Sequence, residues 1–448
     1  MTRQIHSDPR KDKVDYAKYS SNQAIHEPFY GLPAEIKFCK LCAVSNQRPN
    51  STVEHRHTKS STKQTIAFDS DNICDACKVA DQKQRGFIDW ELRRKELMEL
   101  CDRYRSKDGS YDCLVPGSGG KDSFYQSWIL KYEFGMHPLT VTWAPHLYTE
   151  WGWRNFQKWI HSGFDNILVT PNGLVKRLVT RLAVENLFHP FQPFIFGQKS
   201  LAPKIAVEKK IPLIFYGENE AEYGNPIADN SSAKRDFAYF SSASEDEIYL
   251  GGTSVSELKE DYGVSDVDLS IYRPLDPQIL NSNGVEVHYL GYYLKWHPQD
   301  AYYFAVDNGA FEASPERTQG TYSKYNSIDD KIDDLHYYTT YVKFGIGRAT
   351  YDASQEVRSG DLERGEAVAL IERYDGEFPD RFIDELLEYL SIPSSKFPIA
   401  SNKFESPIVD LDYFHALSNR FRSPHLWQYE NGLWQLRRTA FDEVARTL

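Results

Sequence analysis

The stretch that decides the fold is Tyr111-Asp-Cys-Leu-Val-Pro-Gly-Ser-Gly-Gly-Lys-Asp-Ser123. Its first half is an apolar run typical of a buried strand, and residues 124–134 continue with a helical pattern. The turn between them carries two adjacent glycines, which let the backbone approach a ligand closely. A helix that begins at such a turn presents free N–H groups and the positive end of its dipole, so the stretch predicts an anion site. The glycine–lysine spacing is shorter than in the Walker loop, which excludes that class of NTPase.

Short apolar runs alternate with helical patterns through the segment that surrounds this turn. Strands are predicted at residues 112–117, 138–143, 166–170 and 211–217, and helices at 122–134, 150–162, 173–187 and 199–210. This alternation is typical of an α/β fold in which helices cover both faces of a parallel, Rossmann-like sheet. Ligands of such sheets bind beyond the carboxyl ends of the strands. We therefore expect residues 118–123, 143–146 and 217–219 to meet at one nucleotide site.

The whole chain of 448 residues divides into segments of different composition. We predict an N-terminal extension at 1–36, a double-CxxC module at 37–88, a nucleotide domain at 89–250, a mainly helical, aromatic-rich region at 251–395 and a tail at 396–448. Within these segments we expect a helix over 89–105, with Asp89 as its N-cap, and a terminal helix over 433–446.

Charge and hydropathy exclude several functional classes. A net charge of −12 argues against a large nucleic-acid surface. No apolar run reaches the roughly 20 residues that a membrane span requires, and the first residues lack the apolar stretch of a secretory signal. Four of the six cysteines form CxxC pairs, which favours metal binding in a reducing compartment over disulfides. We expect a cytoplasmic protein with no nucleic-acid partner and no membrane insertion.

The cysteine pairs are Cys39/Cys42 and Cys74/Cys77. Each pair offers two thiolates from one turn, and two pairs complete a tetrahedral Zn²⁺ site. Residues 43–73 exceed the spacing of about 15–20 that is common between such pairs, so this insert must loop out. An iron–sulfur cluster and a redox dithiol are the alternatives. A closed four-thiolate site has no open position for catalysis, so we expect structural zinc.

The Ser-Gly-Gly-x-Asp-Ser turn resembles the PP-loop of ATP pyrophosphatases, which split ATP into AMP and pyrophosphate. Two later blocks extend the resemblance: Arg317-Thr-Gln-Gly-Thr-Tyr-Ser-Lys324-Tyr325 and His336-Tyr-Tyr-Thr-Thr-Tyr-Val-Lys343-Phe-Gly-Ile-Gly-Arg348. With the cysteine pairs they make residues 37–390 similar to the N-acetyl sugar amidotransferases of bacterial lipopolysaccharide O-antigen, pseudaminic acid and legionaminic acid pathways. The extension, the insert between the cysteine pairs and the tail are longer than that family's pattern.

The resemblance implies a sheet of the adenine nucleotide alpha hydrolase type and an ATP-dependent, AMP-forming amidotransferase. Such enzymes convert an N-acetyl group of a surface-glycan sugar into an acetamidino group through an adenylated amide. ATP and Mg²⁺ are required, and a glutaminase partner, similar to the subunits of imidazole glycerol phosphate synthase, supplies ammonia. The residues themselves suit this chemistry, because a leaving pyrophosphate needs backbone N–H groups, a cation and Mg²⁺ around it.

Site residues follow from the motifs. ATP is expected at Ser118, Gly119, Gly120, Lys121, Asp122, Ser123 and Gly217. We expect Lys121, Asp122 and Glu218 to be catalytic, with the carboxylates near Mg²⁺. A sugar carboxylate or a nucleotide diphosphate is expected at Arg317, Lys324, Lys343 and Arg348, and Asn219 is expected to contact the substrate beside Glu218. Arginine suits planar anions, although each cation is equally well explained as a solvated surface charge.

Two other functions remain open from the sequence. A PP-loop tRNA-modifying enzyme, of the thiolation or lysidine type, shares the ATP site but predicts a basic face and, often, a catalytic cysteine pair beside the loop. Cys113 lies inside a predicted strand and suits that role poorly. A non-catalytic zinc-ribbon protein with a degenerate nucleotide fold would have lost loop residues that are present here. The acceptor sugar, the general base and the number of subunits, including a homo-oligomer, stay undetermined.

Overall fold

The computed structural model describes residues 8–20, 26–218, 220–226, 232–392 and 408–445. Within them, five strands form a parallel sheet: β1 (Cys113–Pro116), β2 (Pro138–Trp143), β3 (Asn166–Val169), β4 (Leu213–Tyr216) and β7 (Glu286–Tyr289). The strand order is β3-β2-β1-β4-β7. Successive strands add outward from β1 on one side, and β4 then pairs with its other side. The order therefore reverses between β1 and β4, which is where parallel sheets bind ligands.

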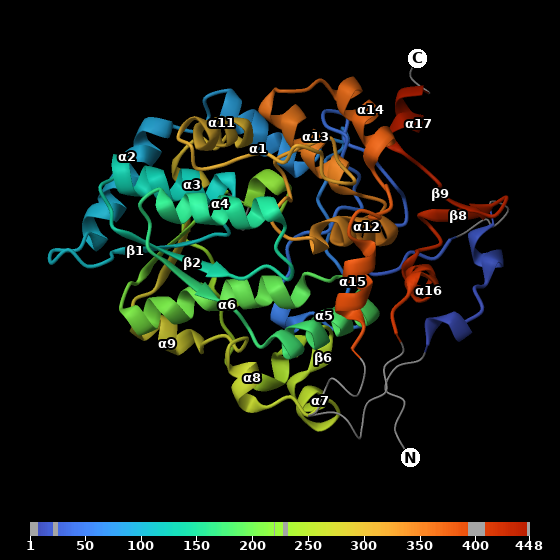
Figure 1. Ribbon diagram of the computed structural model, residues 1–448. Helices are drawn as coiled ribbons and strands as arrows, with labels where there is room; N and C mark the ends of the chain where they lie inside the picture. The colour runs from blue at the N-terminus through green and yellow to red at the C-terminus, as the bar shows by residue number, and fades with distance from the viewer. Residues whose placement is uncertain (1–7, 21–25, 219, 227–231, 393–407, 446–448) are drawn as a thin grey trace.

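Helices cover both faces of this sheet, as Figure 1 shows. On one face, α5 (Gly173–Leu187) and α6 (Gln192–Lys209) share a core with Leu114 of β1. On the other face, α2 (Trp90–Tyr104) packs with Cys113 and Val115 of the same strand. Alternate residues of a strand point to opposite faces, so a central strand must be apolar throughout. The predicted α/β architecture with a parallel sheet is confirmed.

The remaining helices complete the chain. They are α1 (Asp75–Gln84), α3 (Lys121–Trp128), α4 (Glu150–His161), α7 (Val255–Glu260), α8 (Asp266–Ser270), α9 (Pro277–Ser282), α10 (Leu290–Tyr293), α11 (Pro298–Asp307), α12 (Ile332–Phe344), α13 (Arg348–Ser359), α14 (Arg364–Tyr374), α15 (Ile383–Leu390), α16 (Leu411–Phe421) and α17 (Ala440–Ala445). Two short antiparallel pairs are β5 (Tyr249–Leu250) with β6 (Thr253–Ser254), and β8 (Trp427–Glu430) with β9 (Leu433–Leu436). Helices α12 to α16 gather beside the sheet, next to the start of the chain (Figure 1).

The predictions for individual helices and strands are partly confirmed and partly wrong. The helix predicted over 89–105 is α2, and the Asp89 carboxylate accepts a hydrogen bond from Leu92 N at 2.9 Å. The terminal helix predicted over 433–446 is wrong for its first half, since residues 433–436 form β9 and only 440–445 are helical. The fifth strand, β7, lies in a region that we expected to contain helices and irregular connections. It alternates Glu-Val-His-Tyr, because an edge strand needs fewer apolar residues than a central one.

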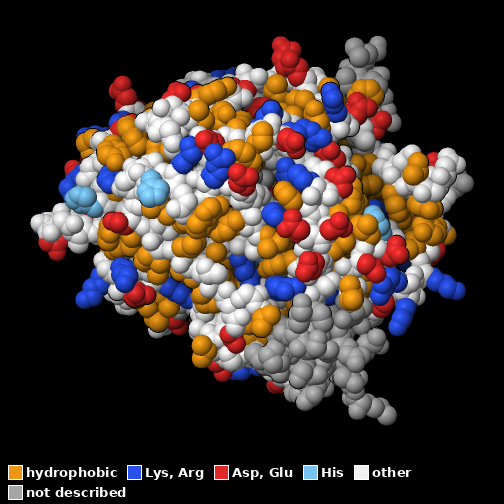
Figure 2. Space-filling view, in the orientation of Figure 1, with side chains coloured by type: hydrophobic (Ala, Val, Ile, Leu, Met, Phe, Trp, Pro, Cys, Tyr) orange, Lys and Arg blue, Asp and Glu red, His pale blue; other side chains and the backbone are white. Residues whose placement is uncertain are grey.

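The surface carries both signs of charge. On the face in Figure 2, Lys and Arg side chains are interspersed with Asp and Glu side chains and with apolar ones. Among the described helices, none is both long and apolar enough to cross a membrane.

Candidate functional site

The predicted anion loop joins the end of β1 to the start of α3. Gly120 is the N-cap residue of α3 and offers no side-chain cap to the first N–H groups of the helix. Those groups have no partner within the helix, as at every helix start. The N–H of Ser118 donates to Ser123 Oγ at 3.2 Å, which closes the turn. The loop therefore presents several backbone donors at the reversal of strand order.

Glycine is required twice in this turn. Gly119 has φ of +92°, and a Cβ built there would lie 2.5 Å from the Phe156 Cα of α4. A Cβ on Gly117 would lie 2.4 Å from Ser123 Oγ. The backbone of the turn is thus pressed against α4. The N–H groups of Gly117 and Ser118 are used within the structure, by the Val141 carbonyl and Ser123 Oγ, so the donors left for a ligand are those at the start of α3. This is the local geometry that a phosphate-binding turn needs.

Substituting Gly119 by alanine is expected to damage both stability and nucleotide binding. The positive φ alone costs about 1–3 kcal/mol for a residue with a Cβ, and the contact with Phe156 backbone atoms forces α4 or the loop to move. Thermal unfolding and equilibrium ATP binding measure the two effects. Gly173→Ala is the matched control, because a Cβ at that helix start has nothing within 4 Å. Equal ATP binding by Gly119→Ala and wild type would contradict the assignment.

Lys121 and Asp122 form an ion pair at the start of α3. Lys121 Nζ lies 2.7 Å and 2.9 Å from the two Asp122 carboxylate oxygens. The Lys121 side chain is 7% exposed, whereas that of Asp122 is 36% exposed. The buried Lys121 ammonium therefore lies beside the backbone donors of α3 and is paired with the partly solvated Asp122 carboxylate.

Glu218 faces this pair from the end of β4. Burial, together with the charges of Asp122 and Glu222, raises the pKa of Glu218 to about 8, while Lys121 opposes the shift. Gln355 Nε2 approaches Glu218 Oε1 at 3.5 Å. Carboxylates that repel one another in a confined site suit a hard divalent cation such as Mg²⁺. The predicted ATP and Mg²⁺ residues of β1 and β4 are thus neighbours, whereas Asn219 lies outside the described residues.

The raised pKa of Glu218 predicts a pH-dependent stability. The folded chain holds a proton on Glu218 up to about pH 8, whereas the unfolded chain loses it near 4.5. Stability is therefore lost as pH rises through this window. Glu218→Gln is expected to match wild type near pH 4.5 and to be about 1–3 kcal/mol more stable at pH 8.5.

Urea unfolding at the two pH values measures this difference. Glu208→Gln, at an exposed position of α6, is the control, and its free energy of unfolding should not differ from that of wild type at either pH. If Glu218→Gln and wild type showed the same dependence of the free energy of unfolding on pH, ionisation of Glu218 would not destabilise the folded chain. The prediction would then be wrong.

The loop before α12 brings further carboxylates to the site. The Asp330 carboxylate accepts hydrogen bonds from His146 N at 2.5 Å, His146 Nδ1 at 2.8 Å and Leu147 N at 3.1 Å. Burial raises the pKa of Asp329, and a hydrogen bond from Ser118 opposes that shift. Residues after β1 and after β2 are therefore both tied to the same acidic loop.

Arg348, at the start of α13, is the predicted substrate cation that lies beside these groups. Its Nη2 is 3.0 Å from Asp352 Oδ1, and its Nη1 donates to the Tyr337 hydroxyl. Burial raises the pKa of Asp333 well above its usual range, as do the charges of the neighbouring aspartates, and Arg348 opposes that rise. Arg348 thus contributes positive charge to a strongly acidic site.

The other predicted substrate cations have partners elsewhere. Arg317 makes a bidentate pair with Glu377, at 2.6 Å for each bond. Lys324 is exposed, and its Nζ donates to the Pro315 carbonyl at 2.9 Å. Lys343 is buried, and its Nζ donates to the Leu187 carbonyl at 2.6 Å. Burial lowers the pKa of Lys343 well below its usual range. The structure does not bring these three side chains to the loop, and their substrate role stays a prediction.

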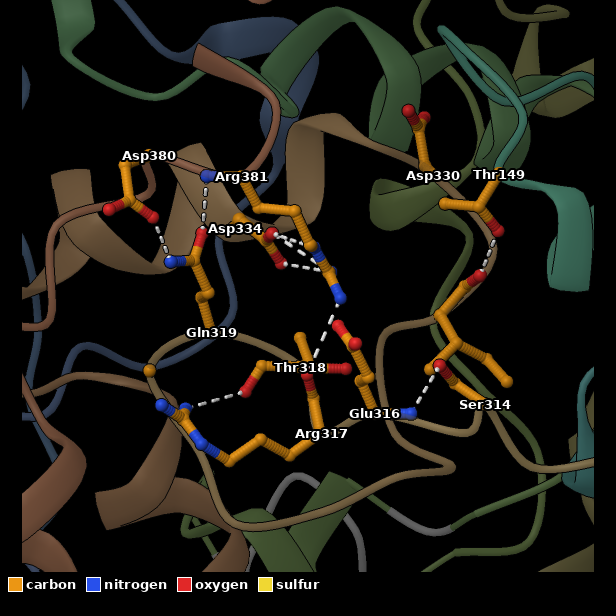
Figure 3. A network of polar contacts seen from close by, with 12 residues as sticks. Thr149, Ser314, Glu316, Arg317, Thr318, Gln319, Asp330, Asp334, Asp380 and Arg381 are labelled. Carbon is orange, nitrogen blue, oxygen red and sulfur yellow. Dashed lines mark hydrogen bonds and ion pairs between the residues drawn. The ribbon is translucent and has the colours of Figure 1, made fainter.

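A polar network fixes the start of α12 (Figure 3). Arg381 pairs with Asp334 at 2.9 Å. Gln319 accepts from Arg381 N at 2.8 Å and donates to the Asp380 carboxylate. Because Asp334 follows Asp333 directly, this network orients the helix turn that carries the acidic site.

The four cysteines of the CxxC pairs come together as predicted. Cys39 Sγ lies 3.7 Å from Cys77 Sγ, and Cys42 Sγ lies 3.8 Å from Cys74 Sγ. All four sulfurs lie within 4.8 Å of one another and are buried. Tetrahedral Zn²⁺ with Zn–S bonds of about 2.3 Å requires separations of about 3.8 Å. The cluster therefore fits zinc, as the sequence indicated, and the two remaining cysteines are buried in the sheet core.

Two arginines join this cluster to the C-terminal helices. Arg358 Nη1, at the end of α13, lies 3.8 Å from Cys42 Sγ. Arg364 Nε, at the start of α14, donates to the carbonyls of Cys39 and Cys42 at 3.2 Å and 3.0 Å. Positive charge beside a four-thiolate site offsets its net negative charge.

Comparison with known proteins gives a functional context. Residues 319–440 match the family described as "LPS biosynthesis protein WbpG-like, C-terminal domain". The match supports an LPS biosynthesis family. That segment contains α12 to α14 and supplies Asp329, Asp330, Asp333 and Arg348 to the site. The chain is also 34% identical over 85 residues to an uncharacterized protein, MJ1599, of Methanocaldococcus jannaschii; this alignment covers 19% of the chain and 29% of that protein.

Asp329, Asp330 and Asp333 are not among the site residues predicted from the sequence. Their signal was an acidic cluster, Asp329-Asp330-Lys-Ile-Asp333-Asp334, around a helix start. Acidic residues are common at helix N-termini because they favour the dipole, so this pattern alone indicates no site. Only the contacts of the segment before α12 with the loops after β1 and β2 give these residues a functional setting.

Proposed function

We propose that this chain is an ATP-dependent, AMP-forming amidotransferase. Its substrate in this proposal is a bacterial surface-glycan sugar whose N-acetyl group becomes an acetamidino group. One observation carries the proposal: the PP-loop-like turn lies against the acidic loop and Arg348 of a segment that matches an LPS biosynthesis family. The turn suits nucleotide chemistry, and the match favours a glycan substrate.

The reaction replaces the amide oxygen by nitrogen. The oxygen forms a bond to the α-phosphorus of ATP as pyrophosphate leaves, and ammonia then forms a bond to the amide carbon. AMP leaves with the former amide oxygen, and loss of a proton gives the acetamidino group. An unactivated amide is a poor electrophile, so the energy of ATP is needed for this exchange.

The residues of the chain have separate roles in this scheme. The N–H groups at the start of α3 and the ammonium of Lys121 bind the departing pyrophosphate. Asp122 and Glu218 hold Mg²⁺, which supplies positive charge at the phosphates. This role requires Glu218 to lose its proton, and a divalent cation favours the ionised form. The hydrogen bond between Ser118 and Asp329 holds the loop to the acidic segment.

Ammonia is poorly retained in water, so the proposal includes a docked glutaminase that delivers it. Purified chain should then use free ammonium but not glutamine, and adding the partner should permit glutamine. Equal rates with ammonium and with glutamine in the absence of any partner would exclude this part of the proposal.

The nucleotide product tests the reaction. The full chain is incubated with ATP, Mg²⁺, ammonium and a panel of acetamido sugars, including nucleotide-linked and nonulosonic forms. We expect AMP and pyrophosphate only when a sugar is present, with the sugar mass changed by replacement of oxygen by NH. AMP formed only with tRNA would instead indicate the modification enzyme, and ADP as the product would contradict a PP-loop reaction.

A further inference from the structure

The insert between the cysteine pairs brings three metal-binding side chains together. Glu54 belongs to a short 3-10 segment (Glu54–Arg56), and His57 follows it directly. His57 Nδ1 lies 3.3 Å from Glu54 Oε2, and His189 Nε2 lies 3.6 Å from Glu54 Oε1. One ligand atom from each of the three residues lies within 4.8 Å of the others. His189 comes from the corner between α5 and α6, far away in the sequence.

The surrounding structure holds these side chains in place. Thr52 Oγ1 donates to Glu54 Oε1 at 2.9 Å, and Gln192 Nε2 donates to the Glu54 carbonyl at 2.7 Å. The side chains of Glu54 and His57 are 9% and 4% exposed, and that of His189 is 16% exposed. Burial lowers the pKa of His57 to about 4, which leaves the neutral imidazole that a metal requires.

We propose that Glu54, His57 and His189 bind a second zinc ion, separate from the four-cysteine site. Tetrahedral Zn²⁺ with nitrogen and oxygen ligands at about 2.0–2.1 Å needs ligand separations of about 3.4 Å. The two imidazoles lie at 3.3 Å and 3.6 Å from different oxygens of the Glu54 carboxylate, and one ligand atom from each of the three residues lies within 4.8 Å of the others, so a small movement of the side chains would close the site on an ion. Two imidazoles and one carboxylate form an established zinc donor set that leaves one position open. The site joins the insert, which carries Glu54 and His57, to the corner between α5 and α6, which carries His189.

A fourth side chain lies at the edge of the cluster. His336 of α12 is stacked on His189, with ring centroids 5.2 Å apart. Its Nδ1 is buried and has no hydrogen-bond partner among the described residues. Because His336 lies three residues after Asp333, the zinc site is close to the candidate nucleotide site.

Lysine side chains provide the competing explanation. Lys63 Nζ lies 3.4 Å from Thr52 Oγ1, and Glu54 acts on the pKa values of both Lys63 and Lys343. Burial lowers both pKa values, and the Glu54 carboxylate opposes that shift. Without a metal, the lysines and histidines would neutralise Glu54 by themselves. The two arrangements predict different metal contents.

Metal analysis of the purified full chain decides between them. We expect about two zinc ions per chain, with X-ray absorption showing both sulfur and nitrogen or oxygen ligands. His189→Ala and the conservative Glu54→Gln should each retain one zinc ion with sulfur ligands only. His161→Ala, at the exposed end of α4, should retain both ions. One zinc ion with a sulfur-only shell in wild type would overturn the proposal, and this result needs no variant to fold.

Discussion

Lys121→Ala is expected to lower kcat/KM for sugar-dependent AMP formation by about 10²–10³-fold, the usual cost of removing one preorganised group that stabilises transition-state charge. The Lys121 ammonium is almost fully buried beside the first N–H groups of α3. In the proposed reaction it would interact with the developing pyrophosphate charge in a medium that screens poorly. The fold should survive, because Asp122 is partly exposed and water can solvate it after the substitution. We therefore expect the loss of this ion pair to change the thermal stability little.

Initial rates of AMP release, measured over a range of ATP concentrations, check this expectation. Lys107→Ala removes an exposed lysine before β1 and should leave kcat/KM unchanged. Lys121→Arg retains the charge but not the compact ammonium, and it should recover only part of the activity. If Lys121→Ala retains wild-type kcat/KM with unchanged thermal stability, the lysine is only a partner of Asp122 and the assigned role is wrong.

The parallel sheet could be predicted because its signals are local. The run 138–143 and the helix 173–187 were predicted with the bounds of β2 and α5, since both have strong and regular apolar periodicity. The approach of Lys121 to Glu218 followed from one further rule, that the carboxyl ends of parallel strands meet at one edge. No long-range information was needed for this half of the site.

The hairpin of β8 and β9 shows a local signal that was overlooked. Asn431 and Gly432 connect the two strands with φ of +52° and +81°. Asn-Gly between short apolar segments is a strong indication of a two-residue hairpin turn. The helical pattern over 433–446 competed with it, and the pairing of the two strands decided against the helix.

The acidic half of the site depends on tertiary packing. Asp330 is separated from its partner His146 by 184 positions, and no pattern within either segment indicates the other. Lys343 illustrates the same limit. It was predicted as a substrate cation from the block that ends at Arg348, and the structure places it on α12 with its Nζ donating to the Leu187 carbonyl. Which face of a helix is buried depends on its neighbours, and a single sequence does not specify them.

The double-CxxC module is connected to both parts of the candidate site, the predicted loop with Glu218 and the acidic segment with Arg348. Its cluster is predictable from spacing alone, but its contacts with α13 and α14 are not. Helix α13 also carries Arg348 at its start and Gln355, which approaches Glu218, near its end. The module therefore supports the helix that places two side chains at the candidate site. Loss of its metal should affect both stability and catalysis.

Cys42→Ala is accordingly expected to release the metal of the four-cysteine site and to lower the free energy of unfolding by more than about 4 kcal/mol. Three thiolates bind structural zinc less tightly than four, and metal-binding energy in such modules is folding energy. Removing Cys42 also leaves Arg358 without the sulfur that it approaches. Zinc content and thermal unfolding measure the two effects on the same preparation.

Cys101→Ala is the matched control for this prediction. Cys101 is equally buried, but it packs in the sheet core with Leu97 and Leu100 rather than in the cluster. Its substitution should cost about 1 kcal/mol and leave the zinc content unchanged. The four-cysteine site would not be structural if Cys42→Ala lost its metal and still unfolded at the wild-type temperature. In that case the packing of Arg364 on the Cys39 and Cys42 carbonyls would be sufficient to hold the module against α14.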